Sequence, residues 1–249
     1  MRTQLFIALS GAIAIAAPTL SPCAVAQPED SSTKKTWAGV ATLRTLRSKS
    51  KNGDLLAAYP VFGGSRRVAQ VAGLALKKDA TGSFNEYKKK SRTPTGIGVP
   101  YQLEVSPALV INRPRFISTW VYTYTFDGGV HGYTNTVGYN FGIPNGATGP
   151  RRLLLADFFT DGKDASKRVN DLLMAKLRAT KGKEQEAMWV LDGTVKWVDV
   201  KLRENFVAEA DGMRWVFPPY AVGPYANGNY EVKLSASELG PKFRAALLR

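Results

Sequence analysis

The sequence predicts an α+β fold, built from antiparallel strands and hairpins with packed helices. Three observations lead to this prediction. Residues 116–126 alternate aromatic and β-branched side chains with a period of two, as a strand does. Apolar residues recur at helical spacing in two other stretches, and sequences rich in glycine and proline separate the elements. With 249 residues, 44% of them hydrophobic, the chain is long enough for one sizeable core or two small ones.

The first 26 residues are predicted to be a signal peptide. Arg2 gives a positive start, residues 5–17 are mostly apolar, and Ala24-Val25-Ala26 has the small-x-small pattern of a cleavage site. The apolar run is shorter than the ~20 residues that a membrane span needs. We therefore expect a periplasmic or secreted protein, cleaved near Ala26. The alternative is a lipid anchor at Cys23.

Residues 27–35 are predicted to be a flexible N-terminus, followed by an N-terminal α+β subdomain over residues 36–112. Strands are expected at 37–46 and 55–62, and a helix from about Arg66 to Lys78 with Ser65 as its cap. The lysine run 88–90 is expected on a solvated surface, and residues 101–111 return to a strand pattern.

Residues 113–249 are predicted to form a C-terminal α+β domain. Its clearest element is a hairpin in which the aromatic strand 116–126 leads through a glycine-rich turn, 127–132, into a second alternating strand. The next elements are a helix from Asp164 to near Gly182, a hairpin around Asp211-Gly212 with positive φ in its turn, and a strand at 230–234. A last helix, capped by Ser235 or Ser237, is expected to reach about Leu248. Residues 184–203 receive no assignment.

Composition excludes several kinds of site. One cysteine cannot form a disulfide within its chain, and one cysteine with one histidine cannot supply a Cys/His metal site. We expect neither a metal nor another cofactor. There is no Gly-x-Ser-x-Gly sequence for a serine nucleophile and no phosphate-binding glycine loop.

The basic residues are clustered, and their surplus attracts polyanions. The formal charge is +14, and it becomes +13 when Arg2 leaves with the signal peptide. No recognisable nucleic-acid motif accompanies the clusters, so we expect no specific nucleic-acid partner, and at most a peripheral contact with a membrane.

The order of several motifs resembles the RsiV-like extracytoplasmic domain family. This domain is shared by an anti-sigma factor and the non-catalytic part of a peptidoglycan deacetylase. The resemblance covers about residues 36–247. It is carried by Tyr59-Pro60, the turn 128–132, the segment 155–159, Asn205-Phe206, Asp211-Gly212, and the segment from Pro219-Tyr220 to Gly228.

The resemblance implies an α+β domain that acts at the bacterial cell envelope. In RsiV-like proteins the exported domain binds lysozyme, which makes lysozyme one candidate partner of this chain. Because common lysozymes are basic, such a complex requires a locally acidic contact face.

The candidate ligand-binding residues are Asp127, His131, Tyr220, Tyr225 and Asn227, which belong to the glycine-rich turn and the Pro-Tyr segment. One interpretation is that these residues converge on a sugar or a peptide, because tyrosines in loops are common recognition surfaces. The structural alternative is that His131 bonds the backbone of the Pro-Tyr segment and joins the hairpin to this loop.

These features favour a non-enzymatic binding module at the cell envelope. Its expected partner is peptidoglycan, another anionic envelope polymer, or an envelope protein that works on one. The alternative is a glycan-acting hydrolase with two paired carboxylates, for which Asp127, Asp157, Glu204 and Asp211 are the candidates. A structural or assembly partner is a third class.

Overall fold

A computed structural model describes Trp37 and residues 39–245, which form two sheets with helices packed against them. The predicted signal peptide and flexible N-terminus, residues 1–35, lie outside the described residues. The strands are β1 (Ala41–Ser50), β2 (Gly53–Phe62), β3 (Tyr101–Arg113), β4 (Phe116–Phe126), β5 (Tyr133–Gly142), β6 (Arg151–Arg152), β7 (Phe206–Glu209), β8 (Gly212–Phe217) and β9 (Tyr230–Ser235). The α-helices are α2 (Arg67–Lys90), α3 (Ala165–Arg178), α4 (Met188–Leu191), α5 (Val200–Arg203) and α6 (Ala236–Leu239). Three short 3-10 helices are η1 (Leu155–Phe158), η2 (Gly162–Asp164) and η3 (Tyr225–Asn227).

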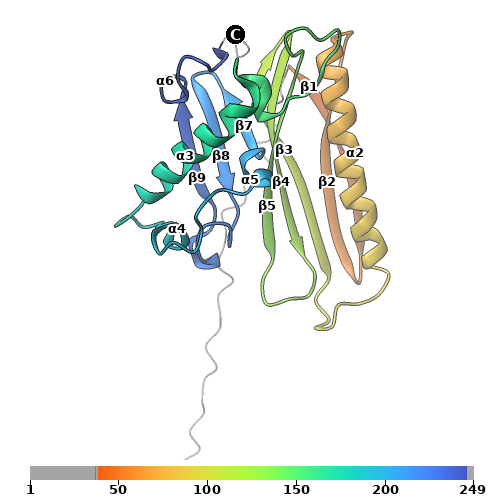
Figure 1. Ribbon diagram of the computed structural model, residues 1–249. Helices are drawn as coiled ribbons and strands as arrows, with labels where there is room; N and C mark the ends of the chain where they lie inside the picture. Colours follow the sequence, from red (N-terminus) through yellow and green to blue (C-terminus); the bar gives the residue numbers. More distant parts are fainter. Residues whose placement is uncertain (1–36, 38, 246–249) are drawn as a thin grey trace, which may run out of the picture.

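The first sheet has the strand order β1-β2-β3-β4-β5-β6. Its neighbours are antiparallel except for β2 and β3, which are parallel and are joined by α2. A parallel pair requires a long crossover, and α2 supplies it while covering one face of the sheet (Figure 1). The predicted α+β class with antiparallel hairpins is therefore confirmed, with one parallel pair added. Residue 113 is where the second predicted subdomain begins. In the structure the first sheet includes strands from both sides of this position, because β3 and β4 are adjacent paired strands.

Helix α2 is longer than the sequence analysis predicted. It extends to Lys90 because helix-spaced apolar residues continue past Lys78, and Ala80, Phe84 and Tyr87 are buried against the sheet. Ser65 does not cap it. The N-cap is Arg66, which makes no side-chain capping bond and instead donates from its guanidinium to Asn112 Oδ1 at 2.9 Å.

The second sheet has the order β7-β8-β9, and its apolar face packs against α3 in the largest core cluster. The hairpin predicted around Asp211-Gly212 is present as β7 and β8. The positive φ predicted for its turn is wrong. Glu209 pairs with Gly212, so Ala210 and Asp211 form the turn, and neither has a positive φ. Glycine is needed at 212 for another reason, since a Cβ there would overlap the carbonyl oxygen of Leu234 on β9.

The predicted terminal helix is also shorter than expected. Ser235 caps α6 by accepting from the Glu238 N–H, while the Glu238 carboxylate accepts from the Ser235 N–H at 2.8 Å. The helix ends at Leu239, because Gly240 has a φ of 82° and the following Pro241 cannot continue a helix.

Two asparagine side chains connect the two sheets. Asn140 on β5 accepts from the Ala208 N–H at 2.9 Å and donates to the Phe206 carbonyl at 2.8 Å. Asn205, just before β7, accepts from the Gly138 N–H and donates to the Thr136 carbonyl, both at 2.7 Å. Each side chain thus satisfies backbone groups at the edge of the other sheet.

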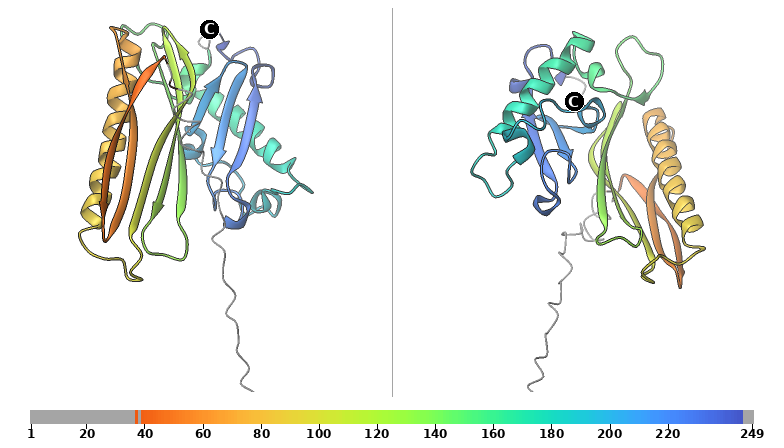
Figure 2. Two further views of the ribbon diagram at one scale, coloured as in Figure 1. Left: turned by 180° about the vertical axis from the view of Figure 1, so that it is seen from behind. Right: turned by 60° about the horizontal axis from the view of Figure 1, so that its bottom comes forward.

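Apolar side chains also connect the sheets, because Ile111 on β3 and Phe116 on β4 belong to the same large core cluster as the buried residues of β7, β8 and β9. Trp120 packs with Val207 and Val216 in a cluster of its own, separate from the two larger cores. In the two views of Figure 2 the sheets lie against each other, with α2 outside one and α3 outside the other. None of the helices among the described residues is long and apolar enough to cross a membrane.

Candidate functional site

Four aromatic rings follow one another where the β4–β5 turn meets the Pro-Tyr segment. The His131 and Tyr225 rings are stacked, with centroids 3.9 Å apart and an interplanar angle of 23°. Tyr225 is 5.6 Å from Tyr220, and Tyr220 is 6.4 Å from Trp189. We call these four residues the aromatic row. It brings together the turn after β4, the loop between β8 and β9, and the start of α4.

The glycines of the β4–β5 turn make this arrangement possible. Gly128 has a φ of 84°, and a Cβ there would be 2.6 Å from the Thr95 Cβ. A Cβ on Gly132 would overlap the ring of Tyr124. These glycines let the backbone fold tightly against its neighbours, so the turn exposes Val130 completely and keeps His131 at the surface.

A hydrogen bond fixes the turn to the Pro-Tyr segment. The Tyr225 hydroxyl donates to the Gly132 carbonyl at 2.8 Å, and His131 Nδ1 lies 3.0 Å from the same oxygen. The structural alternative of the sequence analysis had His131 bonding the backbone of the Pro-Tyr segment. The geometry is the reverse, because the tyrosine bonds the backbone beside the histidine.

Tyr220 has an unusual backbone conformation. Its φ of 68° is the one positive value at a non-glycine residue in the described part of the chain. Such a conformation costs of order 1–3 kcal/mol and persists only when neighbouring contacts hold it. Here the Tyr220 N–H donates to the Gly223 carbonyl at 3.1 Å. The result is a tyrosine that is stacked near Trp189 and still 51% exposed.

The other two predicted site residues support this arrangement from the side. Asn227 donates to the Glu186 carbonyl at 3.2 Å and to the Tyr230 hydroxyl at 2.9 Å, which connects η3 to the segment before α4. Asp127 accepts from Lys90 Nζ at 3.0 Å. Tyr87 lies in α2, as Lys90 does. Its burial raises the pKa of its hydroxyl group, and a hydrogen bond to Asp127 raises it further.

Of the predicted residues, His131, Tyr220 and Tyr225 therefore lie together, while Asp127 and Asn227 fix the segments that carry them. The sequence analysis missed Trp189. Trp189 lies in the segment 184–203, to which the sequence analysis assigned no structure. Its large aromatic side chain was the signal that could have identified it as a candidate.

The four carboxylates considered for a hydrolase all have partners among the described residues. Asp127 is paired with Lys90, and Asp211 is 2.9 Å from Lys233 Nζ. The other two, Asp157 and Glu204, accept from successive N–H groups at the start of η1, those of Leu154 and Leu155, each at 2.8 Å.

These last two acids differ in their surroundings. Asp157 is also paired with Arg151 at 2.6 Å. Burial, and less strongly the charge of Asp157, raise the pKa of Glu204, although its bond to the Leu155 N–H acts in the opposite direction. The two carboxylates thus lie close together as caps of one turn.

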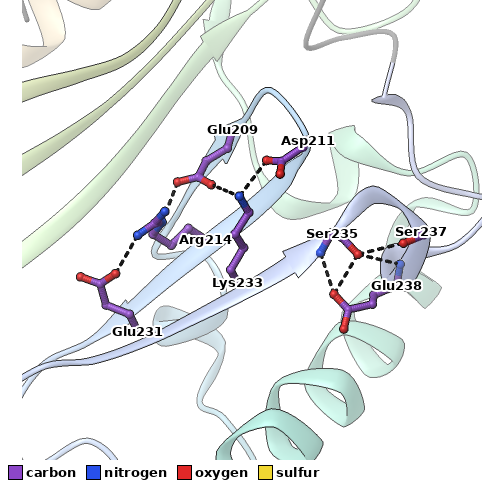
Figure 3. Close-up of polar contacts among 8 residues, drawn as sticks. All are labelled: Glu209, Asp211, Arg214, Glu231, Lys233, Ser235, Ser237 and Glu238. Carbon is purple, nitrogen blue, oxygen red and sulfur yellow. Dashed lines mark hydrogen bonds and ion pairs between the residues drawn. The ribbon is translucent and has the colours of Figure 1, made fainter.

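An ion-pair network covers part of the second sheet (Figure 3). Arg214 bridges Glu209 at 2.6 Å and Glu231 at 2.8 Å, and Lys233 bridges Glu209 at 3.0 Å and Asp211 at 2.9 Å. A polar pocket of about 480 Å³ lies between this network and the end of β3. The acids that line it, Glu209 and Asp211, are each ion-paired with a base of this network.

No group of three or more His, Cys, Asp or Glu residues is placed to hold a metal ion within residues 39–245.

One part of the chain matches a protein-family model, and most of the chain is similar in fold to solved structures. No curated protein sequence matches the chain. Among solved structures, it is similar to a DUF3298 family protein from Pseudomonas aeruginosa, with a TM-score of 0.59 and 14% identity over 84% of this chain and 96% of that one. It is also similar to a DUF3298 family member from Bacteroides fragilis, with a TM-score of 0.56 and 16% identity over 84% of this chain and 97% of that one.

The sequence match includes three of the four residues of the aromatic row. Residues 156–237 contain Trp189, Tyr220 and Tyr225, whereas the turn with His131 lies before them. It is these residues, 156–237, that match the family described as "Protein of unknown function (DUF3298)", and the fold around them is shared with two solved proteins of that family.

Proposed function

We propose that this chain is a non-enzymatic binding module of the bacterial cell envelope, and that the aromatic row holds a glycan strand of peptidoglycan. One observation carries the proposal: Tyr220, held at a φ of 68° and 51% exposed, lies next to the rings of Trp189 and Tyr225. The C–H face of a sugar ring packs on the face of an aromatic ring, while nearby polar groups bond its hydroxyls.

Close contacts and a hydrogen bond hold the segments of the site together in the absence of a ligand, which supports a binding role. Glycines at 128 and 132 fit their neighbours closely, and the Tyr225–Gly132 hydrogen bond joins the turn to the Pro-Tyr segment. A ligand that binds fixed rings loses less free energy to ordering the protein than one that binds mobile loops.

We also propose that the chain is an RsiV-like domain, exported after cleavage near Ala26. The motifs at 128–132 and 219–228 support this, as does the similarity in fold to two bacterial proteins. Another anionic envelope polymer, or a protein partner such as lysozyme, would use the same exposed rings.

Co-sedimentation with purified peptidoglycan tests the proposal. Tyr220→Ala and Trp189→Ala are expected to weaken binding at least tenfold, as removal of a central aromatic contact does. Trp197→Ala is the matched control, because Trp197 is 72% exposed and lies outside the aromatic row. Circular dichroism confirms that each variant is folded.

The outcomes separate the candidate functions. Equal binding by Tyr220→Ala, Trp189→Ala and the wild type would remove the aromatic row as the site. Release of soluble sugars from the same material would favour the hydrolase with a carboxylate pair. Binding to lysozyme but not to peptidoglycan, lost in Tyr220→Ala, would assign the site to a protein partner.

A further inference from the structure

We infer that the glycan is anionic, and that its negative groups are bound by a basic cluster at the C-terminal end of α2. The cluster consists of Lys51, Lys88, Lys89 and Arg92. This inference rests on the proposed function, since it adds a second contact to a ligand that the aromatic row holds.

All four side chains of the basic cluster are exposed, and none makes an ion pair with another described residue. Their neighbours Lys49 and Lys90 are different. Lys49 is 3.2 Å from Asp54, and Lys90 is 3.1 Å from Glu86 and 3.0 Å from Asp127. The cluster therefore keeps its positive charge available for a ligand.

A series of contacts connects the basic cluster to the aromatic row. The β1–β2 turn lies against the end of α2, because a Cβ on Gly53 would be 2.7 Å from the Ser91 Cβ. Lys90 bonds Asp127 at the base of the next turn. Asp127 and His131 are four residues apart, so their Cα atoms are separated by at most about 14 Å.

Figure 1 shows the same relationship, with the end of α2, the following connection and the β4–β5 turn all at one end of the molecule.

The separation between the two surfaces is fixed by the fold. Lys90 bonds Asp127 after β4, and Tyr87 in the same part of α2 is buried in the core cluster of the first sheet, so the end of α2 is held against the hairpin. A chain with regularly spaced negative groups can reach both surfaces at once. The second contact is then intramolecular, which raises the overall affinity.

Carboxylates and phosphates are the groups that lysine and arginine side chains bind in water. Each exposed pair contributes modestly and is screened by salt. The cluster should therefore contribute to affinity at low ionic strength and contribute little at high ionic strength. The aromatic row should contribute at both.

The test uses peptidoglycan before and after its carboxyl groups are converted to amides with carbodiimide and ammonia. The sugar faces remain the same, and the negative charge is removed. Lys88→Gln/Lys89→Gln is compared with Lys77→Gln/Lys78→Gln, which removes the same two charges from exposed positions of the same helix. Lys77 and Lys88 are about 16 Å apart along the helix axis.

At low salt the Lys88→Gln/Lys89→Gln variant is expected to bind unmodified peptidoglycan about fivefold more weakly than the wild type. It should bind the amidated material as the wild type does, and the difference should disappear at high salt. Lys77→Gln/Lys78→Gln should have a smaller effect on unmodified peptidoglycan.

Equal effects of the two double variants would overturn the inference, because charge alone would then explain them. Wild-type binding that is unchanged by amidation would overturn it as well, while leaving the glycan proposal intact. Loss of the proposed function has a different signature, namely wild-type binding by Tyr220→Ala to both materials. Tighter binding to phosphatidylglycerol vesicles than to peptidoglycan, dependent on Lys88 and Lys89, would assign the cluster to a lipid surface instead.

Discussion

The Tyr225 hydroxyl donates a hydrogen bond to the Gly132 carbonyl, 2.8 Å away and 93 positions earlier in the sequence. This bond joins the β4–β5 turn to the segment between β8 and β9. It also places the Tyr225 ring against His131. The position of the aromatic row therefore depends on the packing of the two sheets.

Tyr225→Phe keeps the ring and removes this hydrogen bond. We expect the free energy of unfolding to fall by about 1 kcal/mol, the usual net value of one hydrogen bond. Urea denaturation measures it. Tyr133→Phe, at an exposed tyrosine outside the row, is the control. Equal stability of Tyr225→Phe and the wild type would mean that the bond does not hold the turn.

Asn140→Leu is expected to destabilise the protein by about 3 kcal/mol or more. The change leaves the Ala208 N–H and the Phe206 carbonyl without the side-chain partner that now satisfies them, in a region where Asn140 is 2% exposed. Asn145→Leu makes the same substitution at an exposed turn and should change stability by less than about 0.5 kcal/mol. Similar losses in both variants would contradict the role given to Asn140.

Two glycine-to-alanine substitutions should have opposite effects. A Cβ on Gly138 would overlap the Phe206 carbonyl oxygen, so Gly138→Ala must separate β5 from β7, at an expected cost of about 2–3 kcal/mol. Gly82 lies inside α2 with nothing within 4 Å of its would-be Cβ. Gly82→Ala should therefore stabilise the protein by up to about 1 kcal/mol. Thermal unfolding of both variants checks the signs.

Glu238 should stabilise the protein at neutral pH and lose this effect in acid. A salt bridge from Lys176 and bonds from Ser235 lower the pKa of Glu238 to about 2. The carboxylate therefore contributes stability above its ordinary pKa, and the contribution is lost as the pH falls toward 2. Glu238→Gln should be less stable than the wild type at pH 6, by less than about 1 kcal/mol for this exposed pair, with a difference that shrinks toward pH 2. A constant difference would contradict the assignment.

Glu204 should show the opposite dependence. Burial raises the pKa of this carboxyl group, so ionisation opposes folding as the pH rises through its folded-state value. Stability relative to Glu204→Gln should accordingly decrease as the pH rises above about 4.3, the ordinary pKa of a glutamate, since glutamine has no charge to desolvate. Glu184→Gln removes a charge from an exposed position and serves as the control. Denaturation curves across this range measure the effect, and an increase with pH would contradict it.

Much of the secondary structure followed from local pattern. Alternation of aromatic and β-branched residues predicted β4 correctly, and the turn at 127–132 was recognised from its glycines. The sequence analysis was wrong about two helix ends, although the signals there were local. It ended α2 too early, while helix-spaced apolar residues continue past Lys78, and it continued the last helix past Gly240 and Pro241, which follow its end at Leu239.

For the site, the glycine-rich turn and the Pro-Tyr segment identified three residues that the structure brings together, His131, Tyr220 and Tyr225. The sequence analysis did not include Trp189, and it placed Asp127 and Asn227 at the ligand rather than in supporting contacts. Those roles are set by partners on other elements, which no local pattern reveals.

The sequence by itself determined the periodicity of the strands, the glycines that permit tight turns, and the surplus of positive charge, because these are properties of neighbouring residues. The tertiary structure decided that β2 and β3 are parallel, that Asn140 and Asn205 join the sheets, and that four rings meet at one end. These depend on side chains that are distant in sequence. Their contacts form only when burial of two separate apolar cores brings the elements together.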